Sequence, residues 1–265
     1  MGSRIGIIGG SGLYSLLEKD EKVDVKSDYG KPSGVALGAL AGRKVAFIPR
    51  HGPRHTMPPH LVPYRANIDA MGKVEVKRII ATNAVGSLKE SYKPGDFVLF
   101  DQFFNATSGR QDTFFEGSPV THVGMAEPYC PEMRRVAAGA AKKLGLRLHE
   151  TGTVVVINGP RYSTRAESRF FGAMGFETIN MTQYPEVALA RERAMCYLGI
   201  GFVTDYDVGL AGNPTVKPVS TDEVQRTFGR SIEKVKSLIT MIVESLPETR
   251  SCGCSHALDG AAISP

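Results

Sequence analysis

Two carboxylates stand one residue apart directly after an apolar run. Asp205 and Asp207 follow the stretch 198–204, whose apolar and β-branched residues predict a buried strand. Residues i and i+2 of an extended segment point to the same side, so both carboxylates can face one ligand. Burial raises the pKa of an unpaired carboxyl, which can then deliver a proton to a heteroatom. The pattern predicts a proton donor, and the alternative is a pair that caps the following loop.

A glycine-rich turn lies near the N-terminus, in the stretch GIIGGSGL at residues 6–13. It is not a Walker loop, because no Lys follows the glycines. It is not a dinucleotide fingerprint either, because Ser15 stands where the third Gly is required. The N–H groups of Gly9, Gly10 and Gly12, with the Ser11 hydroxyl, could bind an oxyanion. The alternative is a tight turn that needs glycine for a positive φ.

Basic and polar side chains follow two further apolar runs. Arg50, His51, Arg54 and His55 come after the run 44–48, and the guanidinium group is suited to bidentate binding of an oxyanion. The stretch TNAVGS at 82–87 could add amides and hydroxyls. Open sheets bind ligands at the carboxyl ends of their strands, so these loops and the glycine turn are expected to share one phosphate. A solvated loop is the alternative for 50–55.

Two polar loops complete the candidate site: NGPRYSTRAES at 158–168 and NMTQYPE at 180–186. The first leaves a predicted strand and enters a predicted helix with many hydrogen-bond donors. Tyr162 could stack on a planar base, although packing in a core is the commoner role of a single Tyr.

The chain has four cysteines, and their spacing does not indicate a zinc site, which usually has two close pairs. Cys130 and Cys196 are interpreted as buried free thiols. Cys252 and Cys254 form a Cys-Gly-Cys pair in a small-residue tail, where a redox or disulfide role is as plausible as none. No metal site is expected.

Strand and helix patterns alternate along the whole chain, which predicts one α/β domain over 1–265, with a C-terminal tail at about 247–265. Strands are expected at 4–8, 44–48, 78–83, 97–103, 152–157 and 198–204. Helices are expected at 131–144, 164–174, 186–197 and 221–245. Ser220 and Glu223 stand at capping-box spacing before the last of these.

Composition excludes several classes of protein. The net charge is +5 and the sequence pI is near 9.0, but basic and acidic residues are interspersed, so no nucleic-acid-binding stripe is present. No apolar run reaches the roughly 18 residues of a membrane helix, and the N-terminus lacks the pattern of a signal peptide. A cytoplasmic enzyme with no membrane and no nucleic-acid partner is expected.

Nine motifs, in order along residues 4–245, together resemble the 5′-methylthioadenosine phosphorylase branch of the nucleoside phosphorylases. They are GIIGGSGLY, PRHGPRH, PYRANI, NAVGSLKE, PGDFVLFDQF, MAEPYCP, NGPRYSTRAES, NMTQYPEVALARE and VTDYDV. The resemblance implies one α/β domain around a mixed, partly barrel-like sheet flanked by helices. It also implies a homotrimer or a pair of trimers.

The resemblance assigns roles to particular residues. Phosphate would be held by Ser11, Arg50, His51, Asn83, the backbone amide of Ala84, and Thr182. Asn83 stands where many relatives have Thr or Ser. Met181 would pack on the ribose and Tyr162 on the base. Asp205 and Asp207 would contact the adenine edge, with Asp205 donating a proton to N7. His122 would reach the 5′-substituent bound by a neighbouring subunit.

The implied reaction needs no cofactor, since inorganic phosphate is the co-substrate. Phosphate would cleave 5′-methylthioadenosine to adenine and 5-methylthioribose 1-phosphate. Relatives line the 5′-pocket with apolar residues, whereas Thr221, Val224 and Gln225 stand here, and two of these are polar. The stretch 209–217, which looks longer than in many relatives, could reshape this pocket. Adenosine, or a 6-oxopurine nucleoside such as 5′-methylthioinosine, inosine or guanosine, therefore remains an alternative substrate. The two Asp residues favour a 6-aminopurine.

Two other classes remain as alternatives. A Rossmann oxidoreductase fails on the missing glycine and on the absence of the expected acidic residue. A nucleoside-sensing binding protein on the same fold would keep the site but lack turnover. The Cys-Gly-Cys tail resembles that of phosphorylases from heat-loving archaea, which implies intrasubunit disulfides.

Overall fold

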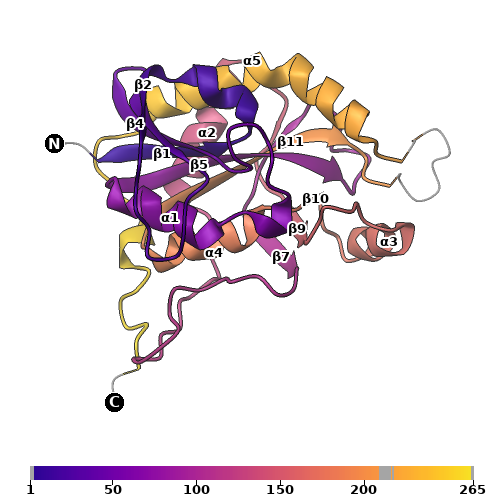
Figure 1. The fold of residues 1–265 in the computed structure, drawn as a ribbon. Coiled ribbons are helices and arrows are strands. Elements are labelled where there is room, and N and C mark those ends of the chain that lie inside the picture. Colours follow the sequence, from indigo (N-terminus) through magenta and orange to yellow (C-terminus); the bar gives the residue numbers. More distant parts are fainter. Residues whose placement is uncertain (1–2, 209–215, 217, 264–265) are drawn as a thin grey trace.

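The computed structural model describes residues 3–208, 216 and 218–263 (Figure 1). Its centre is an 11-stranded mixed sheet. Four strands run parallel in its middle, in the order β4 (Arg43–Pro49), β1 (Arg4–Gly9), β5 (Val76–Ser87) and β11 (Cys196–Asp205). These apolar runs are buried on both faces, as parallel strands usually are. The expected α/β class with a mixed sheet is confirmed.

The sheet is extended on both sides of this centre. Beside β4 lie β3 (Val35–Leu40) and β2 (Glu18–Val23), both antiparallel to their neighbours. Beside β11 lies antiparallel β6 (Phe97–Leu99), which pairs with β8 (Leu148–His149). The other end of the sheet consists of β10 (Thr178–Asn180), β9 (Thr153–Ile157) and β7 (Gln102–Ala106).

One edge of β5 changes partner along its length, and this positions the site. β1 pairs with β5 as far as Ala81, whereas β10 pairs with it only from Gly86. Between these two contacts, residues 82–85 are paired with β11 on the other edge. Ala84 is exposed there, within a strand whose other residues are mostly buried. The sheet therefore opens at the middle of β5, where polar backbone can reach a ligand.

Helices cover the two faces of the sheet. α2 (Pro131–Lys143) and α5 (Thr221–Ser245) pack on one face, while α1 (Tyr64–Lys73) and α4 (Gln183–Glu192) pack on the other (Figure 1). α3 (Arg165–Ala173) lies at one end, and its N-terminus has the reciprocal capping box of Thr164 and Glu167. Side chains alternate between the faces, since Ile7 packs with α5 and Ile8 with α1. No helix in the described residues is long and apolar enough to cross a membrane.

The expected elements are confirmed with two exceptions. The expected strand 97–103 is two strands, because the chain leaves β11 after Leu99 and then pairs with β9. The helix expected at 186–197 is wrong at both ends. α4 begins at Gln183 and ends at Glu192, Ala194 takes a positive φ of 50°, and Cys196 already opens β11. α1, β2, β3, β8 and β10 were not expected.

Candidate functional site

A cavity of about 900 Å³ opens at the carboxyl ends of the central strands. Gly10 and Gly12 follow β1, Arg50 follows β4, and Asp205 closes β11. Eleven of the expected site residues line it: Arg50, His51, Asn83, Ala84, Tyr162, Met181, Thr182, Asp205, Asp207, Thr221 and Val224. Gln225 lines it as well. Topology thus brings together residues from seven distant parts of the sequence.

Asp205 is a buried carboxyl held by two hydrogen bonds. Its Oδ1 accepts from the Thr204 hydroxyl at 2.6 Å and its Oδ2 from the backbone N–H of Asp207 at 2.9 Å. Burial raises the pKa of Asp205 to about 7, and the nearby charge of Asp207 adds to the rise. A carboxyl with this pKa is protonated in about half of the molecules at neutral pH, as a general acid requires.

Asp207 lies beside Asp205 and is oriented by the loop before α3. The Ser163 hydroxyl lies 2.6 Å and 2.5 Å from its two carboxylate oxygens. Burial raises the pKa of Asp207, against the opposing effect of this hydroxyl and that of Ser168. Asp207 has a positive φ of 46°, which turns the chain away from β11. A Cβ on Gly86 would lie 3.0 Å from Asp205 Oδ2, so glycine leaves room for the two carboxyls.

The guanidinium group of Arg50 is held in place by the buried carboxylate of Glu186. Its Nε and Nη2 donate to the two oxygens of Glu186 at 2.7 and 2.8 Å, and its Nη1 donates to the carbonyl of Thr82 at 2.9 Å. Desolvation lowers the pKa of Arg50, but the pairing with Glu186 outweighs it, so the pKa lies above its ordinary value. A guanidinium group has five N–H donors. These three bonds leave two for a ligand in the cavity.

Glu186 is itself held by a second buried group. It is 0% exposed, and the Tyr197 hydroxyl donates to its Oε1 at 2.7 Å. Glu186 was not among the expected site residues, although it lies in the polar stretch 180–186. The pairing of Glu186 with Arg50 depends on how α4 packs against the sheet. The sequence around Glu186 does not indicate this packing.

Two histidines form one wall. The rings of His51 and His55 stack with centroids 4.5 Å apart. Nδ1 of His51 lies 2.8 Å from the carbonyl of Met57, so the neutral ring donates from Nδ1 and keeps a lone pair on Nε2. Burial, followed by the charge of Arg50, lowers the pKa of His51 to about 4. His51 is therefore neutral at physiological pH.

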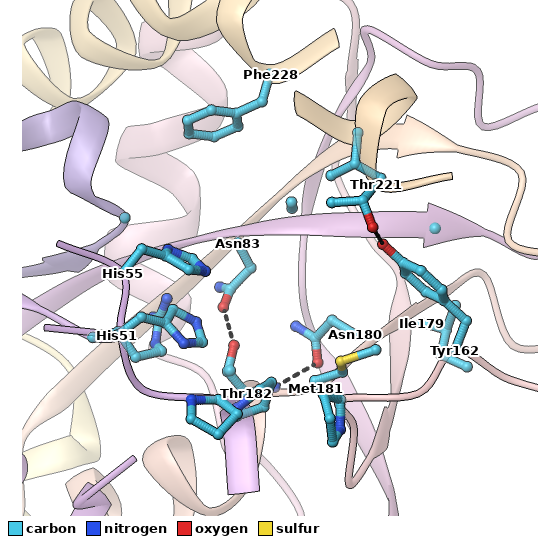
Figure 2. Close-up of a pocket in the computed structure, with 18 of the residues that line it drawn as sticks. His51, His55, Asn83, Tyr162, Ile179, Asn180, Met181, Thr182, Thr221 and Phe228 are labelled. Carbon is cyan, nitrogen blue, oxygen red and sulfur yellow. Dashed lines mark hydrogen bonds between the residues drawn. The ribbon is translucent and has the colours of Figure 1, made fainter. Parts of the chain in front are cut away.

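Asn83 and Thr182 form a polar pair on the floor of the cavity (Figure 2). The Thr182 hydroxyl donates to Asn83 Oδ1 at 2.9 Å, and the Thr182 N–H donates to Asn180 Oδ1 at 3.3 Å. With its Oδ1 engaged in this way, the Asn83 side chain still provides an amide N–H donor. Asn180 was not among the expected site residues.

The remaining wall is mostly apolar. Phe228 of α5 lies across the cavity from Met181 and Thr182 (Figure 2). The Tyr162 hydroxyl lies 3.3 Å from the Thr221 hydroxyl, and this contact connects the loop before α3 with the N-terminus of α5. Phe228 was not among the expected site residues, and its ring also packs on Phe202.

Two expected residues are not assigned to the cavity. Gly10 and Gly12 line it, but the side chain of Ser11 between them lies outside the described residues. His122 is exposed outside the cavity of its own chain, and its backbone N–H donates to the carbonyl of Ala261 at 2.9 Å. Its contact with a neighbouring subunit stays a prediction. Most of the stretch 209–217 also lies outside the described residues.

The four cysteines converge far from this cavity. Their sulfur atoms all lie within 4.8 Å of one another, and Cys196 Sγ is 3.4 Å from Cys252 Sγ. Cys130 and Cys196 are buried and free, as expected. The spacing of the cysteines along the sequence did not indicate this cluster, because the fold brings positions 130, 196, 252 and 254 together.

Comparison with known proteins identifies relatives over almost the whole chain. The profile of the phosphorylase superfamily matches residues 4–244. The S-methyl-5′-thioadenosine phosphorylase of Thermofilum pendens is 53% identical over 98% of each chain. The enzyme of the same name from Pyrococcus abyssi is 53% identical over 96% of this chain and 97% of its own.

Solved structures agree with these relatives. A methylthioadenosine phosphorylase from an Antarctic soil metagenomic library has a TM-score of 0.92 and 37% identity, covering 100% of this chain and 93% of its own. A mutant adenosine/methylthioadenosine phosphorylase from Schistosoma mansoni, in complex with adenine, has a TM-score of 0.90 and 35% identity over 98% and 99%. The chain belongs to the phosphorylase superfamily and, within it, to the 5′-methylthioadenosine phosphorylase branch.

Proposed function

We propose that this member of the phosphorylase superfamily transfers the pentosyl group of 5′-methylthioadenosine to inorganic phosphate. The products are adenine and 5-methylthioribose 1-phosphate. The observation that carries the proposal is a cavity with a proton-donating carboxyl, Asp205, near an anion-binding arginine, Arg50. The named activity of relatives that are about 53% identical supports it.

Phosphate is proposed to bind at the opening of β5. Arg50 offers two free N–H donors and Asn83 offers an amide N–H. The Thr182 hydroxyl, which donates to Asn83 Oδ1 in this structure, turns to donate to phosphate. The backbone amide of Ala84 joins this set of donors, whereas neutral His51, whose Nδ1–H is bonded to Met57, accepts at Nε2 from a protonated phosphate oxygen. Because Glu186 compensates the charge of Arg50, the anion keeps enough negative charge to stabilise a cationic ribosyl group and to attack its anomeric carbon.

The base is proposed to bind against the two carboxyls at the end of β11. As the bond between the anomeric carbon and the base nitrogen breaks, electrons flow into the purine. Asp205 in its protonated form donates to N7 and makes the purine a better leaving group. Asp207, oriented by Ser163, accepts a hydrogen bond from the 6-amino group. Phosphate forms the new bond to the anomeric carbon, so the transfer needs no cofactor.

The 5′-substituent is proposed to lie against the N-terminal half of α5. Of the two polar residues there, Thr221 already uses its hydroxyl in the contact with Tyr162. Val224 and Phe228 then present an apolar wall suited to a methylthio group. Gln225 is the remaining polar residue, and it keeps adenosine as a second candidate substrate. The name of the Schistosoma relative, an adenosine/methylthioadenosine phosphorylase, supports the same candidate.

The expected assembly is a homotrimer or a pair of trimers, in which His122 of one subunit completes the 5′-pocket of the next. Sedimentation equilibrium tests this part of the proposal. A monomer that is fully active at assay concentration would exclude the role of His122.

The decisive experiment compares kcat/KM with phosphate for 5′-methylthioadenosine, adenosine, 5′-methylthioinosine and inosine, by release of free base. We expect 5′-methylthioadenosine to be the best substrate. If kcat/KM for adenosine is equal or higher, adenosine phosphorolysis is the activity of this chain instead. Preference for the inosine pair would overturn the roles given to Asp205 and Asp207. Binding without turnover of all four would indicate a sensing protein.

A further inference from the structure

A cluster of four thiols lies outside the catalytic cavity. Cys130 is the residue before α2, Cys196 opens β11, and Cys252 and Cys254 come from the tail. Their four sulfur atoms lie within 4.8 Å of one another. We propose that the reduced chain binds one soft divalent cation, such as Zn²⁺, between these four cysteine sulfurs.

The distances fit such a site. Zinc–sulfur bonds of about 2.3 Å in a tetrahedron place the sulfurs about 3.8 Å apart. The sulfur atoms of Cys196 and Cys252 are 3.4 Å apart, and no pair of the four exceeds 4.8 Å. Small side-chain rotations therefore suffice to close the tetrahedron. A donor set of four sulfurs selects zinc-like ions and rejects magnesium or calcium, which prefer oxygen.

The surroundings favour thiolates at this point. The backbone N–H of Met133 donates to Cys130 Sγ at 3.5 Å, at the N-terminus of α2, where the helix dipole favours negative charge. Arg78, the β5 partner of Cys196, is 1% exposed and its Nε has no hydrogen-bond partner. Four thiolates around a divalent cation carry two net negative charges, and Arg78, which also pairs with the buried Glu132 carboxylate at 3.8 Å, is the cation beside them.

The tail is held in place independently of any metal. Arg78 Nη2 donates to the carbonyl of Thr249 at 2.8 Å, and Ser251 donates to Glu132 from both its N–H and its hydroxyl. These contacts fix the chain just before the Cys-Gly-Cys pair. The site is therefore largely formed before the ion binds, and binding releases the four thiol protons to solvent.

The test uses full-length protein reduced under anaerobic conditions, since disulfides would consume the same sulfurs. Co²⁺ is then titrated and replaced by Zn²⁺. We expect one Co²⁺ per chain, with the sulfur-to-cobalt charge-transfer band and the visible bands of a tetrahedral site. Zn²⁺ should abolish these bands, and four thiols should become titratable only after chelation.

Matched variants identify the ligands. Cys254→Ser should lose the charge-transfer intensity of the four-sulfur site and bind Co²⁺ at least tenfold more weakly, whereas the neighbouring Ser255→Ala should behave as wild type. If Cys254→Ser does not fold, the Cys252→Ser variant and the titration of the wild-type protein test the proposed site instead. A reduced protein with four free thiols that takes up no Co²⁺ overturns the proposal. Undiminished uptake of Co²⁺ by variants that lack Cys252 or Cys254 overturns it as well.

Discussion

The two ends of β11 carry opposite kinds of buried polar cluster. Cys196 opens the strand within the four thiols, and Asp205 closes it beside the phosphorylase cavity. Ten residues of extended chain separate the two clusters by about 30 Å. At the thiol end the sulfur atoms face one another. At the carboxyl end, donors and acceptors face open space that a substrate can fill.

The difference shows how one strand can serve both stability and chemistry. The core of the strand is buried on both faces, so each end is held rigidly. Cys130, Cys196 and Cys254 belong to the core on the α2 and α5 face, and Cys252 packs against it. Asp205 instead has a raised pKa of about 7 and two bonds that orient it. We therefore expect changes at the carboxyl end to alter turnover, and changes at the thiol end to alter unfolding.

The largest expected effect comes from Asp205→Asn. Loss of the proton donor should lower kcat by about 10²- to 10⁴-fold, with a much smaller change in the KM for phosphate. Asp96→Asn is the matched control, because Asp96 is also buried but lies away from the cavity, paired with His149. Equal losses in kcat and phosphate affinity for Asp205→Asn would break the assignment.

The same carboxyl sets the expected pH dependence. Its pKa is raised to about 7, so the donor form predominates below that pH, and kcat should fall as pH rises above it. Its protonated form also favours the fold, so its contribution to stability is complete at acid pH and is lost as pH rises through about 7. Asp205→Asn should lack this stability loss, measured by thermal unfolding at pH 5 and 9. Parallel curves for the two proteins would contradict the pKa assignment.

The next effect is expected from Glu186→Gln. A neutral amide cannot orient Arg50 through two charged hydrogen bonds, so the KM for phosphate should rise by about 10- to 100-fold. The KM for the nucleoside should change little. Asp69→Asn, which removes a carboxylate paired with Arg193 outside the cavity, is the control. A fall in kcat alone, with phosphate KM unchanged, would mean that Glu186 does not position Arg50.

The smallest expected effect is the energetic coupling between substitutions at the two ends of β11. Asp205→Asn and Cys254→Ser act about 30 Å apart and share no partner, so their free-energy changes should add. The shift in unfolding midpoint of the double variant should equal the sum of the single shifts within about 2 °C. A larger deviation would show that β11 transmits strain from one cluster to the other.

The site residues at the carboxyl end of β11 could be predicted from the sequence because the patterns that indicate them are local. An apolar run followed by Asp205 and Asp207 identifies a strand end by itself, and Arg50 follows the same rule after β4. The family pattern then supplied Thr182, Asn83 and the branch. Ser11 and His122 remain untested by the described residues, and so does the division into one domain with a tail.

Other features could not be predicted, because tertiary contacts decide them. Glu186 takes its role from Arg50, which is 136 residues away, and Phe228 reaches the cavity because α5 packs over β11. The thiol cluster combines three distant segments, so its spacing resembled no metal motif. Helical spacing continued past Glu192, but the positive φ of Ala194 ended α4 and let Cys196 start a strand.

The last described residues of the chain have a practical consequence for handling the protein. Thr121 and Ala262 form an isolated β-bridge, Ile263 donates to the carbonyl of Val120, and His122 donates to that of Ala261. The described residues of the tail contribute no atom to the cavity of their own chain, yet they brace the segment that carries His122. A tag or surface linkage joined close to Ile263 would therefore pull on that brace and disturb the segment that carries His122.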